Sequence, residues 1–228
     1  EESGVEVVEG ARAGVERPAE GLRGLGIGQR AVGDGEERLE LRIAEPEAGG
    51  HAAGGDGEVG RDGVAPVDIA EGEVPEAVTD AIINRGYGDL GIHTELFAGA
   101  MRRLSESGAI TNRWKKDIDF SVSSIFLAEN QEGYDWLDFN CSIQSRGCTY
   151  TNRVGRIAQQ PQMVSINSAM GVDLAGNIWA DSLEARNIYS GVGGQADFIR
   201  GVQYAEGGVA IIALKSMTSK GQSKIIDR

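Results

Sequence analysis

The first 70 residues of this 228-residue chain contain no lysine, asparagine, threonine, methionine, cysteine or aromatic residue. They hold 16 of the 34 glycines and account for −9 of the formal net charge of −13. A segment with no aromatic and few large aliphatic side chains buries too little apolar surface to offset the entropy lost on folding. We therefore predict that residues 1–70 are a poorly ordered, acidic, glycine-rich segment and that a separate domain occupies residues 71–228.

Two origins fit the composition of residues 1–70. The dominance of Gly, Ala, Arg, Glu, Asp, Val, Leu and Pro is what GC-rich DNA encodes in a shifted reading frame. The other origin is a natural acidic tail rich in glycine. A continuous reading frame in the transcript would exclude the frame shift.

Other absences exclude whole classes of function. The acidic balance argues against a nucleic-acid surface, which needs basic side chains to neutralise phosphates. No apolar run approaches the roughly 20 residues that cross a bilayer, so we expect no membrane span. The N-terminus is acidic where a signal peptide is basic, and we expect a cytoplasmic protein. Cys141 and Cys148 lack the spacing of zinc ligands, and we predict reduced thiols that are at least half-buried.

Beyond Val74, the apolar pattern alternates between helical and strand-like spacing. Helical spacing occurs at residues 74–84, 98–107, 131–137 and 196–204. Strand-like runs occur at residues 89–94, 121–127, 163–172, 177–180 and 209–214, with a hairpin predicted around Gly176. This alternation predicts an α/β fold with a mixed open sheet layered by helices.

The first candidate for chemistry is an acid that directly follows a predicted strand. Glu95 comes after the run at 89–94 and before a predicted helix. Ligands of α/β proteins usually bind at this end of the strands, and a carboxylate there can act as a nucleophile toward an activated acyl group. The alternative is an ordinary acid near a helix start, where the helix dipole favours it. The nearby His93 is interpreted as a packing residue.

A second candidate is a glycine-rich motif just before a predicted helix. It contains Gly191, Gly193, Gly194 and Gln195. Closely spaced glycines let backbone N–H groups bind an anion or form an oxyanion hole. The spacing matches neither the phosphate-binding loop of nucleotide hydrolases nor the dinucleotide fingerprint. The alternative is a tight turn without a ligand.

A third candidate is Asn167, which lies with Ser168 in the strand-like run 163–172. Its amide could present a hydrogen-bond donor to a bound molecule. The alternative is a hairpin whose polar residues serve the turn.

In this order, four motifs resemble the C-terminal domain of the acetyl-CoA hydrolase/CoA-transferase family, which includes 4-hydroxybutyrate- and butyrate-type CoA-transferases. The motifs are DLGIHTELF, VSINSAMGVDLAGNIWADS, YSGVGGQADFIRG and GGVAIIAL. The resemblance runs from about Val74 to Arg228 and implies the fold of a class I CoA-transferase domain. It departs in part at residues 70–78, where the family has GIG-x-IP-x-AV: Pro75, Ala77 and Val78 are kept, and the first glycine turn is not. The N-terminal domain of the family is missing, and so is the last part of the C-terminal one, so we expect an incomplete fragment.

The resemblance implies that Glu95 attacks an acyl-CoA thioester and that CoA passes through a glutamyl-CoA thioester to a small carboxylic acid. The glycine-rich motif would lie beside CoA, and Asn167 would be a donor on the substrate side. Coenzyme A is then a substrate, and neither a tightly bound cofactor nor a metal is expected. Apolar surface left by the missing domain predicts a homo-oligomer. Two alternatives stay open: an acyl-CoA hydrolase, and a non-catalytic remnant of a broken gene.

Overall fold

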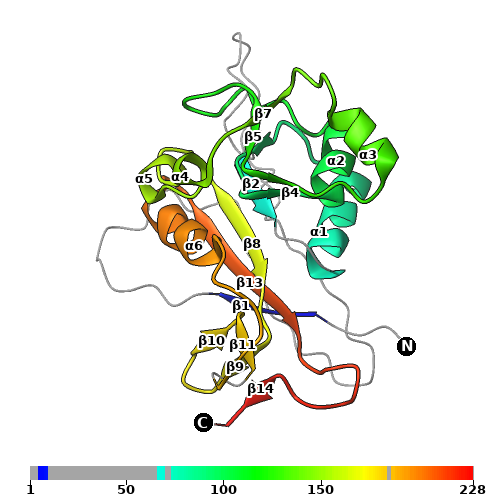
Figure 1. The fold of residues 1–228 in the computed structure, drawn as a ribbon. Helices are drawn as coiled ribbons and strands as arrows, with labels where there is room; N and C mark the ends of the chain where they lie inside the picture. The colour runs from blue at the N-terminus through cyan, green and yellow to red at the C-terminus, as the bar shows by residue number, and fades with distance from the viewer. Residues whose placement is uncertain (1–4, 10–65, 70–72, 184–185, 228) are drawn as a thin grey trace, which may run out of the picture.

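The computed structural model describes residues 5–9, 66–69, 73–183 and 186–227 (Figure 1). Most of residues 1–70, for which poor order is predicted, lie outside these ranges. Two strands of that segment are described, β1 (Val5–Glu9) and β2 (Pro66–Ile69). Strand β2 is buried and lies before the boundary predicted at residue 71. The packed domain therefore includes residues on the N-terminal side of that boundary.

A five-stranded mixed sheet, in the order β1-β13-β8-β2-β3, forms the centre of the molecule. Strands β13 (Val209–Lys215), β8 (Val164–Ser168), β2 and β3 (Gly91–Ile92) run parallel, and β1 is antiparallel to β13. The mixed sheet predicted from the sequence is thus confirmed. The continuous apolar run of β13 is typical of a parallel strand that is covered on both faces.

Helices cover both faces of the sheet. The helices α1 (Glu73–Asn84) and α2 (Gly99–Glu106) lie on one side of β8 and β13, and α5 (Val154–Ile157) and α6 (Gln195–Tyr204) lie on the other (Figure 1). The first core contains Val78, Ile82, Met101 and Leu104 from the helices, packed on Val67, Ile69, Ile92, Ile166 and Ile211 from the strands. The second core contains Ile157, Met163, Phe198 and Val202.

Side-chain alternation in β2 decides where its one acid points. Val67 and Ile69 belong to the first core. Because successive strand residues face opposite sides of a sheet, Asp68 points away from that core, toward the α5–α6 side.

The region between α2 and α5 is built from short elements. The predicted strand at 121–127 is two strands, β5 (Ser121–Ser123) and β6 (Ile125–Phe126). Strand β5 pairs with β7 (Ile143–Ser145), and β6 pairs with β4 (Leu96–Phe97). The strand breaks at Ser124 because the Ser124 N–H and hydroxyl both bind the Glu95 carbonyl. Helices α3 (Gln131–Leu137) and α4 (Cys148–Thr151) complete the region.

The predicted hairpin around Gly176 is confirmed. Strands β9 (Gly171–Asp173) and β10 (Ile178–Trp179) are antiparallel, Gly176 has φ 86°, and the Asp173 carboxylate accepts from the backbone and the amide of Asn177, each at 2.8 Å. The predicted strand at 163–172 is divided, because β8 joins the central sheet and β9 joins a small sheet with β14 (Ile225–Ile226). Strands β11 (Ser182–Leu183) and β12 (Asn187–Ile188) form a separate pair.

Both cysteines are free and exposed, so the prediction of half-buried thiols is wrong. Cys141 lies in the connection before β7 and Cys148 begins α4. Connections run over the surface, and this location outweighs the general tendency of cysteine to be buried. Among the residues described, no helix is long and apolar enough to cross a membrane. The same residues contain no group of three or more His, Cys, Asp or Glu side chains placed to hold a metal ion.

Candidate active site

The backbone of Glu95 is anchored between β3 and β4. Its carbonyl accepts hydrogen bonds from the Ser123 hydroxyl at 2.9 Å, from the Ser124 hydroxyl at 3.1 Å and from the Ile125 N–H at 2.8 Å. A residue held this firmly presents its side chain from a fixed base, which a reactive group needs.

The carboxylate of Glu95 is bound by two donors from distant parts of the chain. Oε2 accepts from the backbone N–H of Gly194 at 2.7 Å, and Oε1 accepts from Asn152 Nδ2 at 3.0 Å. Gly194 is the N-terminal cap of α6, whose N–H groups favour an anion. The acid therefore contacts the start of α6. The start of α2, which the alternative interpretation assumed, is not its partner.

Gly194 is the member of the glycine-rich motif on which the carboxylate depends. A Cβ added to Gly194 would collide with Glu95 Oε2 and lie 2.6 Å from Asn152 Nδ2. A Cβ on Gly193 would lie 3.8 Å from Glu95 Oε2, and one on Gly191 would meet nothing within 4 Å. Gln195 is the first residue of α6. Of the motif, it is Gly194 whose backbone N–H binds the carboxylate.

Asn152 was not identified as a site residue from the sequence. It follows α4, a single helical turn with no apolar period that would have signalled an ordered element. Its predecessor Thr151 is tied to the segment between β3 and β4 that carries Glu95, because His93 Nε2 donates to the Thr151 carbonyl at 2.9 Å. The bond between His93 and Thr151 therefore holds together the two segments that carry Glu95 and Asn152.

His93 performs this role as a neutral side chain. It is fully buried, with its ring near those of Tyr150 and Phe198. Burial lowers the pKa of His93 to about 4, and the bond to Thr151 only partly opposes this shift. Since a carbonyl can only accept, the proton is on Nε2, and Nδ1 is buried without a partner. The interpretation of His93 as a packing residue fits this environment.

Asn167 lies in a buried polar network and not at the carboxylate. Its amide donates to Ser165 Oγ at 2.9 Å, and the Ser165 hydroxyl donates to Asp68 Oδ2 at 2.9 Å. Asp68 Oδ1 accepts from the Thr94 hydroxyl at 2.7 Å, directly before Glu95. The role of Asn167 as a substrate-side donor stays a prediction. Asp68 was missed because its low-complexity surroundings gave no sign of a strand.

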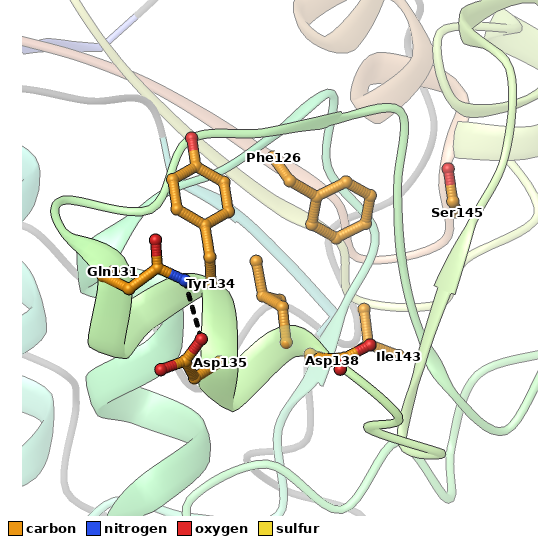
Figure 2. A pocket seen from close by; sticks show the side chains of 8 residues that line it. Phe126, Gln131, Tyr134, Asp135, Asp138, Ile143 and Ser145 are labelled. Carbon is orange, nitrogen blue, oxygen red and sulfur yellow. Dashed lines mark hydrogen bonds between the residues drawn. The ribbon is translucent and has the colours of Figure 1, made fainter.

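The structure also has a pocket of about 540 Å³ (Figure 2). It is bounded by α3 and by strands β6 and β7. The lining side chains are Phe126, Gln131, Tyr134, Asp135, Leu137, Asp138, Ile143 and Ser145. Figure 2 shows Gln131 bonded to Asp135 along one turn of α3. None of the site residues predicted from the sequence lines this pocket.

Known proteins resemble the chain over most of its length. The succinyl-CoA:acetate/propanoyl-CoA:succinate CoA transferase of Fasciola hepatica is 38% identical over 164 residues, which are 71% of this chain and 34% of the relative. The 4-hydroxybutyrate coenzyme A transferase of Clostridium kluyveri is 35% identical over 158 residues, with 69% and 36% covered. The crystal structure of RipA from Yersinia pestis matches with a TM-score of 0.66 and 36% identity, over 72% of this chain and 37% of that one.

The chain spans about a third of the length of these curated relatives. Residues 130–228 match the family model described as the acetyl-CoA hydrolase/transferase C-terminal domain. That range contains both donors to the Glu95 carboxylate, Asn152 and Gly194. The resemblance drawn from the sequence motifs is thereby confirmed, and residues 130–228 belong to the acetyl-CoA hydrolase/transferase C-terminal domain family.

Proposed function

We propose that this chain contributes the nucleophile of a CoA-transferase and that Glu95 is that nucleophile. The observation that carries the proposal is the Glu95 carboxylate, held by a helix N-terminal N–H and a side-chain amide. The names of the relatives describe exchange of CoA between acyl-CoA and a small carboxylate. A fixed carboxylate at the carboxyl edge of the sheet suits that exchange, because covalent catalysis divides one difficult transfer into easier steps.

The proposed reaction begins with attack of a Glu95 oxygen on the thioester carbonyl carbon of acyl-CoA. A C–O bond forms, the C–S bond breaks, and an acyl-glutamyl anhydride and the CoA thiolate result. The thiolate then attacks the glutamyl carbonyl carbon, which releases the acyl group as a carboxylate and leaves a glutamyl-CoA thioester. A second carboxylate accepts CoA by the reverse of these two steps, and Glu95 is restored.

Gly194 and Asn152 have two tasks in this scheme. In the resting state they orient the Glu95 carboxylate. When the CoA thiolate attacks the glutamyl carbonyl carbon, the same donors face the Glu95 oxygen on which negative charge develops. Donors that are already in place are worth more in a site closed to water than in solution. Both lie on elements packed into the domain, α6 directly and α4 through the bond between His93 and Thr151.

The test is mass spectrometry of the chain after incubation with acetyl-CoA and reduction with borohydride. We expect a hydride-reduced side chain at Glu95, because borohydride reduces a glutamyl thioester to an alcohol. Glu95→Gln should give no product, and Glu206→Gln, which alters an exposed glutamate, should behave as the wild type. An unmodified wild-type chain would contradict the proposal and favour a non-catalytic remnant.

Hydrolysis is the second candidate, since the description of the family covers hydrolases as well as transferases. It needs no new residue, because water would replace the acceptor carboxylate in the attack on the glutamyl-CoA thioester, which releases CoA and restores Glu95. With succinyl-CoA as the donor, as in the name of one relative, the two products are acetyl-CoA and free CoA. Acetyl-CoA that forms only when acetate is added supports transfer, and free CoA that is released without acetate supports hydrolysis.

A further inference from the structure

A second acid lies beneath the Glu95 site. Asp68 is 6% exposed and sits on β2, between β8 and β3. Its two carboxyl oxygens accept from Thr94 at 2.7 Å and from Ser165 at 2.9 Å. Thr94 immediately precedes Glu95, so Asp68 is bonded to the neighbour of the candidate nucleophile.

This acid is buried against neutral groups. Both of these donors are hydroxyls, which compensate a buried negative charge less than a cation would. Burial raises the pKa of Asp68 to about 6, the bonds from Thr94 and Ser165 oppose the rise, and the charge of Glu95 adds to it. The two acids therefore act on each other electrostatically, although no hydrogen bond joins them directly.

We propose that Asp68 is a positioning residue of the Glu95 site, which ties Thr94 to β8 and whose negative charge favours acylation of Glu95. The inference rests on the proposed function, since it concerns the reactivity of Glu95. When Glu95 becomes an anhydride or a thioester it loses its negative charge. A second negative charge nearby is repelled by the free carboxylate and not by the acylated form, so ionised Asp68 favours the acylated form.

The network can accommodate both states of Asp68. The Thr94 hydroxyl has a second acceptor, the Leu96 carbonyl at 3.2 Å. It can therefore accept from a protonated Asp68 and still donate to Leu96. The Ser165 hydroxyl, which accepts from Asn167, donates to the ionised form. A proton can leave or join Asp68 without leaving its hydroxyl partners unsatisfied.

Among the charged groups of the surrounding elements, Glu95 is the one that raises the pKa of Asp68. His93, directly after β3, is neutral above a pH of about 4. The neighbours on β8, Ser165 and Asn167, do not titrate. Helix α6, which covers this face of the sheet, carries Asp197 in its first turn.

The first experiment follows the titration of the Asp68 carboxyl by carbon NMR in the full chain, with the signal assigned by Asp68→Asn. We expect a midpoint of about 6 in the wild type. Glu95→Gln should lower that midpoint because it removes the nearby charge, and Glu206→Gln should leave it unchanged. An equal midpoint in Glu95→Gln and in the wild type would overturn the inference.

The second experiment measures the rate at which the borohydride-trapped product of Glu95 forms. Asparagine has the shape of aspartate and can bond to both hydroxyls, so a purely structural role predicts a wild-type rate in Asp68→Asn. Above the pKa of Asp68, we expect instead that Asp68→Asn forms the product about tenfold more slowly than the wild type. Between about pH 5 and pH 7 the rate of the wild type should rise as Asp68 ionises, and the rate of Asp68→Asn should not. A wild-type rate and pH profile in Asp68→Asn would overturn the inference and leave the proposed function intact. If the wild type forms no product, the proposed function fails and the effect of Asp68 on acylation fails with it, and the NMR titration separately tests the electrostatic coupling of the two acids.

Discussion

At the scale of residues, the candidate site depends on contacts between segments far apart in the sequence. The donors to the Glu95 carboxylate are 57 and 99 residues away from it. Glu95 and Gly194 could be proposed from local motifs, because a strand followed by an acid and a glycine run before a helix are readable patterns. Asn152 and Asp68 could not, since their importance comes only from what the fold places beside them.

Gly194→Ala tests the geometry of the carboxylate. The Gly194 backbone, at φ −73° and ψ −9°, is open to alanine, so the turn should survive. The new Cβ would push Glu95 Oε2 and the Asn152 amide out of place. We expect the trapped Glu95 product to form about a hundredfold more slowly, the effect of a misplacement of about 1 Å. Gly191→Ala is the matched control, because its Cβ meets nothing within 4 Å. Equal rates in both variants would contradict the prediction that a Cβ at position 194 displaces the Glu95 carboxylate.

Asp68 should also make stability depend on pH. The pKa of its carboxyl rises from 3.8 to about 6 on folding, so the folded state holds this proton more tightly than the unfolded state. Its contribution to stability is present at low pH and is lost as pH rises between about 4 and 6. The loss should approach roughly 3 kcal/mol, at about 1.4 kcal/mol per pKa unit. Denaturant unfolding of wild type and Asp68→Asn from about pH 4 to pH 8 checks this, and a constant difference between them would contradict it.

At the scale of elements, long amphipathic segments could be predicted and short ones could not. Helices α1, α2, α3 and α6 lie within a residue or two of their predicted bounds. The one-turn helices α4 and α5 were missed, because four residues carry no helical period. Residues 121–127 and 163–172 were each predicted as one strand, and the structure divides each into two strands. The apolar pattern does not reveal which sheet a residue joins.

The contact between α5 and α6 gives a prediction at this scale. A Cβ on Gly201 of α6 would lie 2.5 Å from the Ile157 Cβ of α5. Gly201→Ala should therefore cost about 1–3 kcal/mol of stability through overpacking. Gly155→Ala in α5, where the added Cβ meets nothing, should instead stabilise by about 0.5 kcal/mol through helix propensity. Denaturant unfolding at one pH compares the two, and a Gly201→Ala variant as stable as the wild type or more stable would contradict tight packing at Gly201.

At the scale of the whole molecule, several large apolar side chains face solvent. The side chains of Phe139, Ile188 and Val192 are 93%, 87% and 86% exposed. Singly exposed apolar side chains are normal on protein surfaces, so the homo-oligomer expected from the sequence stays a prediction, and these side chains are positions at which a contact between chains can be tested.

We therefore expect light scattering at micromolar concentration to give a mass above that of one chain. The double variant Phe139→Ser/Ile188→Ser should shift the mass toward that of a monomer, because it removes two of the exposed apolar side chains. Substituting Arg85 and Lys220 by serine, which changes exposed polar positions, provides the control. A wild-type chain that behaves as a sharp monomer would contradict the expectation.

The sequence by itself determined the alternation of strands and helices, the family of residues 130–228 and the place of Glu95 after a strand. Those features are local patterns of apolar spacing, turn residues and motifs, which can be recognised in the sequence without knowledge of the fold. Only the tertiary structure decided that Gly194 and Asn152 bind the Glu95 carboxylate and that Asp68 lies beneath it. The reason is physical: parallel strands are paired through long connections, and the partners that they bring together are set by the packing of the whole sheet.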